Sequence, residues 1–349
     1  MTASPNRADL LVRPAVDGIL AAFETHPLVG LGDRHGLADE GAFYNQLISD
    51  PRFADEVGNV VVEFGSASHQ NTLDRYLAGE DVAYSDLRRV WLDAVGWEPT
   101  IQWSMYQLFF AQVRRTNLGL PLERRIRVWL GDPPADWSTI HTSEDLAPYI
   151  LQRETHPASL IEREILSAGK KALVIYGGRH LLEYADDMLK SWPQLVWLRT
   201  RVEETRPGAF YVVTVHVGFP DPRHSAAFEA EFNWPNATLV SAVGDTSLKS
   251  ALAGPGWSFD AEAAGRDLPG YKPLSAELHD ILMGVAGDAL LYLGPARTLM
   301  TSPYDPSLVM DGALFAELSR RATIKLGSSA RPADWVAEAS RPPRAYARW

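Results

Sequence analysis

Short apolar runs alternate with amphipathic segments along most of this chain. The runs that predict buried strands lie at 28–31, 59–64, 126–130, 172–176, 195–198, 210–217, 239–243 and 288–293. Apolar residues at helical spacing predict helices at 10–25, 37–48 and 314–326. Because strands that alternate with helices are typical of βαβ units, we expect an α/β protein with a mainly parallel central sheet flanked by helices.

Two of the expected strands are followed by nearly the same short sequence motif. The run at 28–31 leads into Gly32-Asp33-Arg34-His35, and the run at 172–176 leads into Gly177-Gly178-Arg179-His180, with a helix expected after each. The chain therefore contains two related strand–histidine–helix units. Because the carboxyl ends of parallel strands lie at one edge of a sheet, we expect His35 and His180 to share one site.

Carboxylates follow other strands in the same way. Glu63 ends the run that starts at Asn59, and Asp132 follows the run at 126–130. Asp136 comes four residues later, after two prolines that restrict the turn. We expect these acids at the same edge as the histidines, with Asp132 and Asp136 as substrate-binding candidates. The alternative is that polar residues follow these strands only because strands end at the surface.

Residues 69–122 interrupt the strand–helix alternation with a helical segment rich in aromatic residues. One interpretation is a helical layer that buries its apolar stripe against the sheet. The other is a cap that shapes an apolar pocket. The second interpretation predicts that at least one of four aromatic residues lines the pocket: Trp97, Trp103, Tyr106 and Phe110. Trp103 and Tyr106 are accordingly substrate-binding candidates.

No convincing linker divides the chain, so we expect a single α/β domain over 1–326 that includes this insert. Residues 250–273 are rich in glycine and proline and predict a long loop. The tail at 327–349, with its prolines and arginines, is expected to be extended or disordered.

Composition limits the classes of partner. The 349 residues carry a formal net charge of -11, which disfavours nucleic acid, and no run is long and apolar enough for a membrane helix. With no cysteine, disulfides and thiolate metal sites are excluded. No secretory signal is evident at the amino terminus, so we expect a cytoplasmic protein that acts on a small-molecule substrate. The sequence does not define the oligomeric state.

Several common catalytic motifs are absent from the sequence, including Gly-x-Gly-x-x-Gly, Gly-x-x-x-x-Gly-Lys, Gly-x-Ser-x-Gly and His-Glu-x-x-His. The nearest match to a serine elbow is Gly65-Ser66-Ala67-Ser68-His69, whose serines are in a different frame. Histidine and carboxylate remain, and they suit two kinds of chemistry. They activate water by general-base catalysis, or they bind one divalent metal ion, with His35, Glu63 and His180 as the ligands. The sequence does not separate the two, so no cofactor is assigned with certainty.

Three short sequence motifs resemble those of one superfamily: Gly32-Asp33-Arg34-His35-Gly36, Val61-Val62-Glu63 and Gly177-Gly178-Arg179-His180. It joins erythromycin esterases, ChaN-like haem-binding lipoproteins and TIKI-type metalloproteases. By this resemblance, His35 is the base or a metal ligand, Glu63 is its partner, and His180 is a second base or ligand. Asp33 stands where the superfamily usually has Glu, which leaves Asp39 or Glu40 as rival carboxylates on the following helix.

Together these observations predict a hydrolase of the erythromycin-esterase-like type that cleaves an ester or amide of a small molecule. Its catalytic candidates are His35, Glu63, His180, Asp33 and Glu40. The alternatives are a ChaN-like protein that binds haem or a divalent metal without turnover, and a metal-dependent biosynthetic enzyme. The substrate cannot be identified from the sequence.

Overall fold

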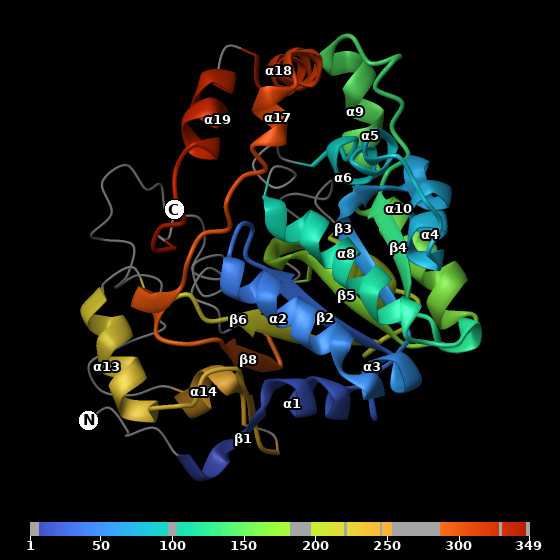
Figure 1. Cartoon of the computed structure of the whole chain (residues 1–349). Coiled ribbons are helices and arrows are strands. Elements are labelled where there is room, and N and C mark those ends of the chain that lie inside the picture. The colour runs from blue at the N-terminus through green and yellow to red at the C-terminus, as the bar shows by residue number, and fades with distance from the viewer. Residues whose placement is uncertain are drawn as a thin grey trace. The chain divides into compact units, whose positions relative to one another are not determined.

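The structure is a computed structural model that describes residues 7–96, 103–181, 197–219, 222–244, 246–252, 287–327 and 330–346. The described residues form eight strands: β1 (Leu10–Pro14), β2 (Leu28–Asp33), β3 (Asn59–Ser66), β4 (Arg127–Asp132), β5 (Ala172–Gly177), β6 (Phe210–Val215), β7 (Thr238–Ala242) and β8 (Ala289–Tyr292). These make one mixed, mostly parallel sheet in the order β1-β7-β8-β6-β2-β5-β3-β4 (Figure 1). The predicted α/β fold is confirmed.

The chain divides into two compact units. Unit 1 comprises Met1–Arg34, Tyr176–Leu299 and Ala345–Trp349, and unit 2 comprises His35–Ile175 and Met300–Arg344. Both are therefore built from segments that lie far apart in the sequence.

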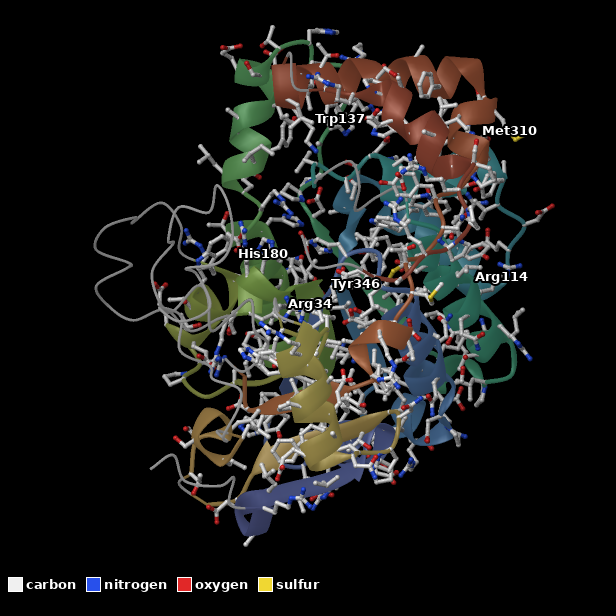
Figure 2. The ribbon with its side chains drawn as sticks, turned by 90° about the vertical axis from the view of Figure 1, so that its left-hand side faces the viewer. Arg34, Arg114, Trp137, His180, Met310 and Tyr346 are labelled. Carbon is white, nitrogen blue, oxygen red and sulfur yellow. The ribbon has the colours of Figure 1, made fainter. Side chains whose placement is uncertain are left out.

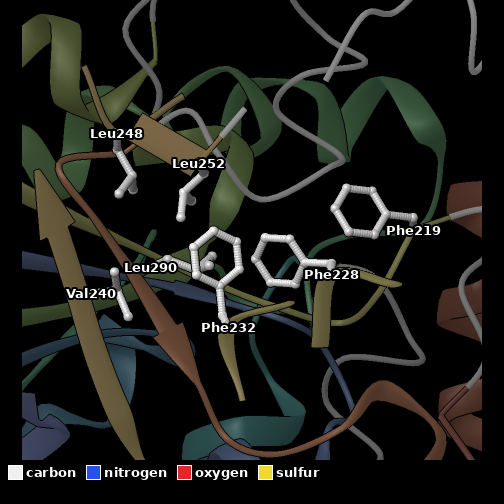
Figure 3. Packing of buried hydrophobic residues seen from close by; sticks show 7 residues of the cluster. All are labelled: Phe219, Phe228, Phe232, Val240, Leu248, Leu252 and Leu290. Atoms are coloured by element: carbon white, nitrogen blue, oxygen red, sulfur yellow. The ribbon is translucent and has the colours of Figure 1, made fainter. Parts of the chain in front are cut away.

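In unit 1, β6 pairs in parallel with β2 and β8, while β7 runs antiparallel to β8 and β1. Its helical segments are η1 (Arg7–Asp9), α1 (Ala15–Ala22), η5 (Gly178–Leu181), α12 (Leu198–Glu203), α13 (Pro222–Phe232), α14 (Leu248–Leu252) and η6 (Ala296–Thr298). Part of its core is a cluster of seven apolar side chains, shown in Figure 3: Phe219, Phe228, Phe232, Val240, Leu248, Leu252 and Leu290. Each such side chain contributes about 1.5–3 kcal/mol when fully buried.

In unit 2, β3 lies between β4 and β5 and is parallel to both. The helical segments up to β5 are α2 (Ala38–Ser49), α3 (Pro51–Glu56), η2 (Ala67–His69), α4 (Gln70–Ala78), α5 (Tyr84–Leu87), α6 (Arg89–Leu92), α8 (Ser104–Leu118), η3 (Leu122–Arg124), α9 (Ser143–Leu151), α10 (Thr155–Ile161) and the π-helical η4 (Glu162–Leu166). The later segment adds α17 (Ser307–Met310), α18 (Gly312–Leu326) and α19 (Pro332–Ala339).

Helix α8 explains the aromatic surplus of the 69–122 segment. It packs beside α2 and α4 (Figure 1). The ring of Phe64 on β3 stacks on Tyr106 with centroids 4.3 Å apart and meets Phe109 and Phe110 edge-on, each at 5.6 Å. Because these four side chains are almost completely buried, the apolar stripe of α8 faces the sheet, as the first interpretation of the insert predicts. Trp97, one of the four predicted pocket residues, lies outside the described residues.

Two local predictions are wrong. The helix predicted over 10–25 begins only at Ala15, because residues 10–14 pair with β7 as an edge strand and Pro14 lies at the N-cap position of α1. The strand predicted at 195–198 also fails, since Leu198 begins α12, where Leu198 and Val202 form a buried i, i+4 pair. Residues 195–196 lie outside the described residues.

Of the loop predicted at 250–273, residues 253–273 lie outside the described part of the chain. In the predicted tail at 327–349, α19 forms with Pro332 in its first turn, where proline is well tolerated. Among the described residues, no helix has the length and apolar character needed to cross a membrane.

Candidate functional site

A β-bulge shapes the edge of unit 2 where β3 and β4 end. The two strands run in register from Asn59 to Val62, after which the register shifts so that Ser66 pairs with Asp132. Glu63 lies at this irregularity, and both Glu63 and Asp132 are buried. Because bulges re-aim side chains and often lie next to active sites, the local geometry brings two acids to one edge of the sheet.

Arg153 joins these two carboxylates. It follows α9 by two residues, and its Nη2 lies 2.5 Å from Glu63 Oε1 while its Nε lies 3.6 Å from Asp132 Oδ1. Its side chain is 16% exposed, against 7% for Glu63 and 1% for Asp132. One guanidinium thus forms ion pairs with two buried acids. No motif in the sequence marks Arg153, because it lies in a turn and its partner Glu63 is 90 positions away in the sequence.

The Asp132 carboxyl group holds its proton more tightly than an ordinary aspartate. Burial raises its pKa, and the negative charge of Glu63 adds to that effect. The charges of Arg153 and Lys325 and the hydrogen bond from the Val95 amide oppose the rise, and the resulting pKa is about 7. Val95 N–H donates to Asp132 Oδ2 over 2.5 Å. At neutral pH, Asp132 is therefore able both to hold and to release a proton.

Asp93 forms a second buried cluster with cationic and imidazole partners. It directly follows α6 and lies 2.7 Å from His69 Nε2, 2.8 Å from Arg321 Nη1 and 3.0 Å from Arg89 Nε. Burial raises the pKa of Asp93, but the hydrogen bond to His69 and the charges of Arg321 and Arg89 outweigh burial and lower the pKa to about 2. Asp93 is therefore ionised throughout the neutral pH range.

Trp137 completes this cluster. Its Nε1–H donates to the Asp93 carbonyl over 2.8 Å, and the guanidinium of Arg321 lies 4.7 Å from its ring centre. Figure 2 shows Trp137 beside α18, the helix that carries Arg321. A cation over a tryptophan face adds roughly 0.5–2 kcal/mol, more when it is desolvated.

The segment from Asp93 to Val95 belongs to both clusters, because the side chain of Asp93 binds His69 and the amide of Val95 binds Asp132. His69 itself ends η2, three residues after β3. The serines of the same run donate to backbone carbonyls, Ser66 to Pro133 at 3.4 Å and Ser68 to Ala135 at 3.1 Å. The sequence contained a signal for His69, a histidine just after a strand, but none for Asp93.

His35 lies at the entry to α2 and contacts the aromatic insert. Its Nδ1 is 3.3 Å from the Tyr106 hydroxyl oxygen, and Tyr106 is completely buried. The neighbouring Gly36 has a φ of +79°, and a Cβ there would lie 2.5 Å from Trp103 Cε2. Glycine is thus required twice over, for the left-handed backbone and for the approach of Trp103.

The other predicted residues are distributed over both units. Glu40, on the first turn of α2, is completely buried, while Asp136 is exposed and accepts hydrogen bonds from the amide and hydroxyl of Ser138, as in a capped turn. Asp33 ends β2 in unit 1, where His180 lies in η5 with its ring 5.5 Å from that of Trp197. The helix predicted after His180, at 181–189, lies outside the described residues from 182 onward. A meeting of His35 with His180 would join the two units and stays a prediction.

Within the described ranges, no group of three or more histidine, aspartate or glutamate side chains has the arrangement of a metal site. A metal ion held by His35, Glu63 and His180, which belong to two different units, stays a prediction.

A groove of about 550 Å³ lies elsewhere in unit 2. It is lined by the later residues of α2 and α8 and by α3, including Ser49, Ala54 and Gln112. Ala54 and Leu120 precede β3 and β4, so the groove lies toward the amino ends of these strands, away from Glu63 and Asp132. The candidate site is thus defined by its charged groups and not by this groove.

No family model matches the chain, and a search of curated proteins finds no match. Two solved structures are similar in fold. One is the type III effector HopBA1, at 15% identity and a TM-score of 0.38, covering 61% of this chain and 89% of the effector. The other is ChaN of Campylobacter jejuni, described with cofacial haem binding, at 12% identity and a TM-score of 0.39, covering 63% of this chain and 95% of ChaN.

Proposed function

We propose that this protein is a hydrolase that cleaves an ester or amide of a small molecule by activating water with histidine and carboxylate groups. The observation that carries the proposal is the buried cluster of Glu63, Arg153 and Asp132 at the ends of β3 and β4. Burying charged groups costs several kcal/mol per ion, so such a cluster is a poor source of stability and a good candidate for chemistry.

His35, Arg153 and Asp132 take separate roles that suit hydrolysis. His35, which the superfamily resemblance makes the base, takes a proton from the attacking water. Arg153 is the most exposed member of its cluster, and Glu63 fixes it, so its guanidinium is suited to stabilise the negative charge that develops on the carbonyl oxygen. Asp132 holds Arg153 from the buried side. This division follows the erythromycin-esterase-like type predicted from the sequence.

The test is steady-state hydrolysis of p-nitrophenyl esters and p-nitroanilides of short acyl chains. We expect turnover by the wild-type protein, and a fall in kcat of at least about 100-fold in His35→Gln, as for the loss of a general base. Glu63→Gln should lower kcat as well, because it releases Arg153. His141→Gln is the matched control, since His141 is exposed in the loop before α9.

Two results would overturn the proposal. One is the absence of turnover with every compound of the panel. The other is turnover that both His35→Gln and Glu63→Gln leave unchanged. A Soret band at one haem per chain that disappears in His35→Ala, in a protein without turnover, would establish the alternative of a haem-binding protein.

A further inference from the structure

The pair formed by His69 and Asp93 has the geometry of an acid–base dyad, and the roles of His35, Arg153 and Asp132 in the proposed reaction do not involve it. His69 Nε2 and Asp93 Oδ2 are 2.7 Å apart. A carboxylate only accepts hydrogen bonds, so Nε2 carries a hydrogen and donates it to Asp93. Asp93 therefore orients the ring and leaves Nδ1 as the reactive nitrogen, and none of the described residues forms a hydrogen bond to Nδ1.

The carboxylate of this dyad is rigidly held. Arg321 Nη1 binds Asp93 Oδ1, Arg89 Nε binds Oδ2, and the Arg321 guanidinium is itself paired with Glu317 at 2.7 Å. These partners keep Asp93 charged and in one orientation. A fixed carboxylate behind an imidazole stabilises the imidazolium form when the ring takes up a proton, and this is the role of the aspartate in hydrolytic triads.

The dyad lies at the edge of unit 2 that also holds the Arg153 cluster. His69 ends η2, the short segment that directly follows β3, and Glu63 lies on β3. The chain between Asp93 and Val95 carries a contact to each cluster. The side chain of His69 is 13% exposed, so its ring is not sealed from solvent.

We propose that His69, oriented by Asp93, is the acid that protonates the leaving group in this hydrolysis, an assignment that rests on the proposed function. The water oxygen forms a bond to the carbonyl carbon, and His35 takes the water proton. The bond from that carbon to the leaving oxygen or nitrogen then breaks, and the leaving atom receives the Nδ1 proton of the His69 imidazolium. Proton transfer from His35 to His69 through solvent restores both rings.

The assignment predicts a dependence on the leaving group that a structural role would not produce. A p-nitrophenolate ion is stable enough to leave without a proton, whereas an alkoxide is not. His69→Gln should therefore lower kcat for the ethyl ester of an acid by at least about 100-fold, the lower range for losing a general acid. With the p-nitrophenyl ester of the same acid, kcat should change little. Asp93→Asn should show the same selectivity if it folds.

The experiment uses butyrate as the acid and measures hydrolysis of its ethyl ester by pH-stat and of its p-nitrophenyl ester by absorbance. Four proteins are compared: wild type, His69→Gln, His35→Gln and the control His141→Gln. His35→Gln should lower kcat for both esters, because both need the base. An equal loss with both esters in His69→Gln, or no loss with either, overturns the role of His69 and leaves the hydrolase intact. A wild-type protein that cleaves only the p-nitrophenyl ester also overturns it. No turnover of either ester overturns the role of His69, whereas the proposed function is refuted only if every compound of the ester and anilide panel fails as well.

Discussion

Asp93 and Asp132 are nearly equally buried, at 3% and 2% exposed, yet their pKa values are about 2 and about 7. Burial raises the pKa of both. Asp93 has two arginines and an imidazole within hydrogen-bond distance, whereas Asp132 shares a single arginine with Glu63. The cations around a carboxylate, and not its burial alone, therefore decide which acid stays charged.

The same contrast assigns two chemical roles to one residue type. Acids whose environments separate their pKa values can act differently at one pH. The Asp93 cluster maintains a fixed negative charge that orients His69. The Asp132 cluster holds a proton that can leave near neutral pH, so the charge beside Arg153 changes with pH.

The largest expected difference is in stability. Asp93→Asn leaves Arg321, which is 11% exposed, without its charged partner, and breaking a buried pair in this way costs about 3–5 kcal/mol. Asp132→Asn replaces a carboxyl group that must take up a proton on folding at pH 6, because its pKa is about 7 in the folded protein and near 4 in the unfolded chain, so we expect a cost of no more than about 1 kcal/mol, the value of one hydrogen bond. Urea unfolding at pH 6 measures both, with exposed Asp86→Asn as the control. Equal costs for the two buried variants would remove the contrast.

The next effect concerns pH. In an unfolded chain an aspartate loses its proton near pH 4, whereas folded Asp132 keeps its proton to about pH 7. Asp132 therefore favours the folded state below pH 4, and this stabilisation is lost as the pH rises to about 7. The free energy of unfolding of the wild type, relative to that of Asp132→Asn, should fall by about 1.4 kcal/mol between pH 5 and pH 6.

Asp93 should behave in the opposite sense. Its folded pKa lies below the unfolded value, so it stabilises the protein above about pH 4 and loses this effect as the pH falls toward 2. A series of urea titrations from pH 3 to pH 8 separates the two slopes. A constant difference between wild type and Asp132→Asn from pH 4 to pH 7 would show that Asp132 is an ordinary ionised carboxylate.

Much of the fold was accessible from the sequence because strand and helix periods are local. The positions of Glu63 on β3 and of Asp132 at the end of β4 could be predicted from apolar runs followed by polar residues. The residues that set their charge could not. Arg153 lies in a turn, and Arg321 reaches Asp93 from a helix more than two hundred positions away in the sequence. Such pairs depend on how segments that are distant in the sequence pack, and no short sequence motif predicts them.

The edge strand β1 failed for a related reason. Its apolar residues also fit a helical spacing, and only pairing with β7, from the far half of the chain, makes Leu10–Pro14 a strand. Local propensity is a weak guide where such tertiary pairing competes with it. His69 is the intermediate case, because its position after β3 was visible in the sequence while its partner was not.

The smallest effect tests whether every cation around Asp93 contributes equally to the free energy of unfolding. Arg89 contacts Asp93 Oδ2 at 3.0 Å as an i, i+4 pair, but its side chain is 57% exposed, against 11% for Arg321. Solvent screens an exposed pair of this kind, so Arg89→Gln should cost about 0.5 kcal/mol in urea unfolding, and less at high salt. Arg321→Gln is the matched comparison and should cost several times more, because it leaves Asp93 buried beside a weaker set of partners. If the two variants cost the same, the contrast between Asp93 and Asp132 depends on the number of nearby charges alone; if Arg321→Gln dominates, it depends on the charges that are buried with the acid.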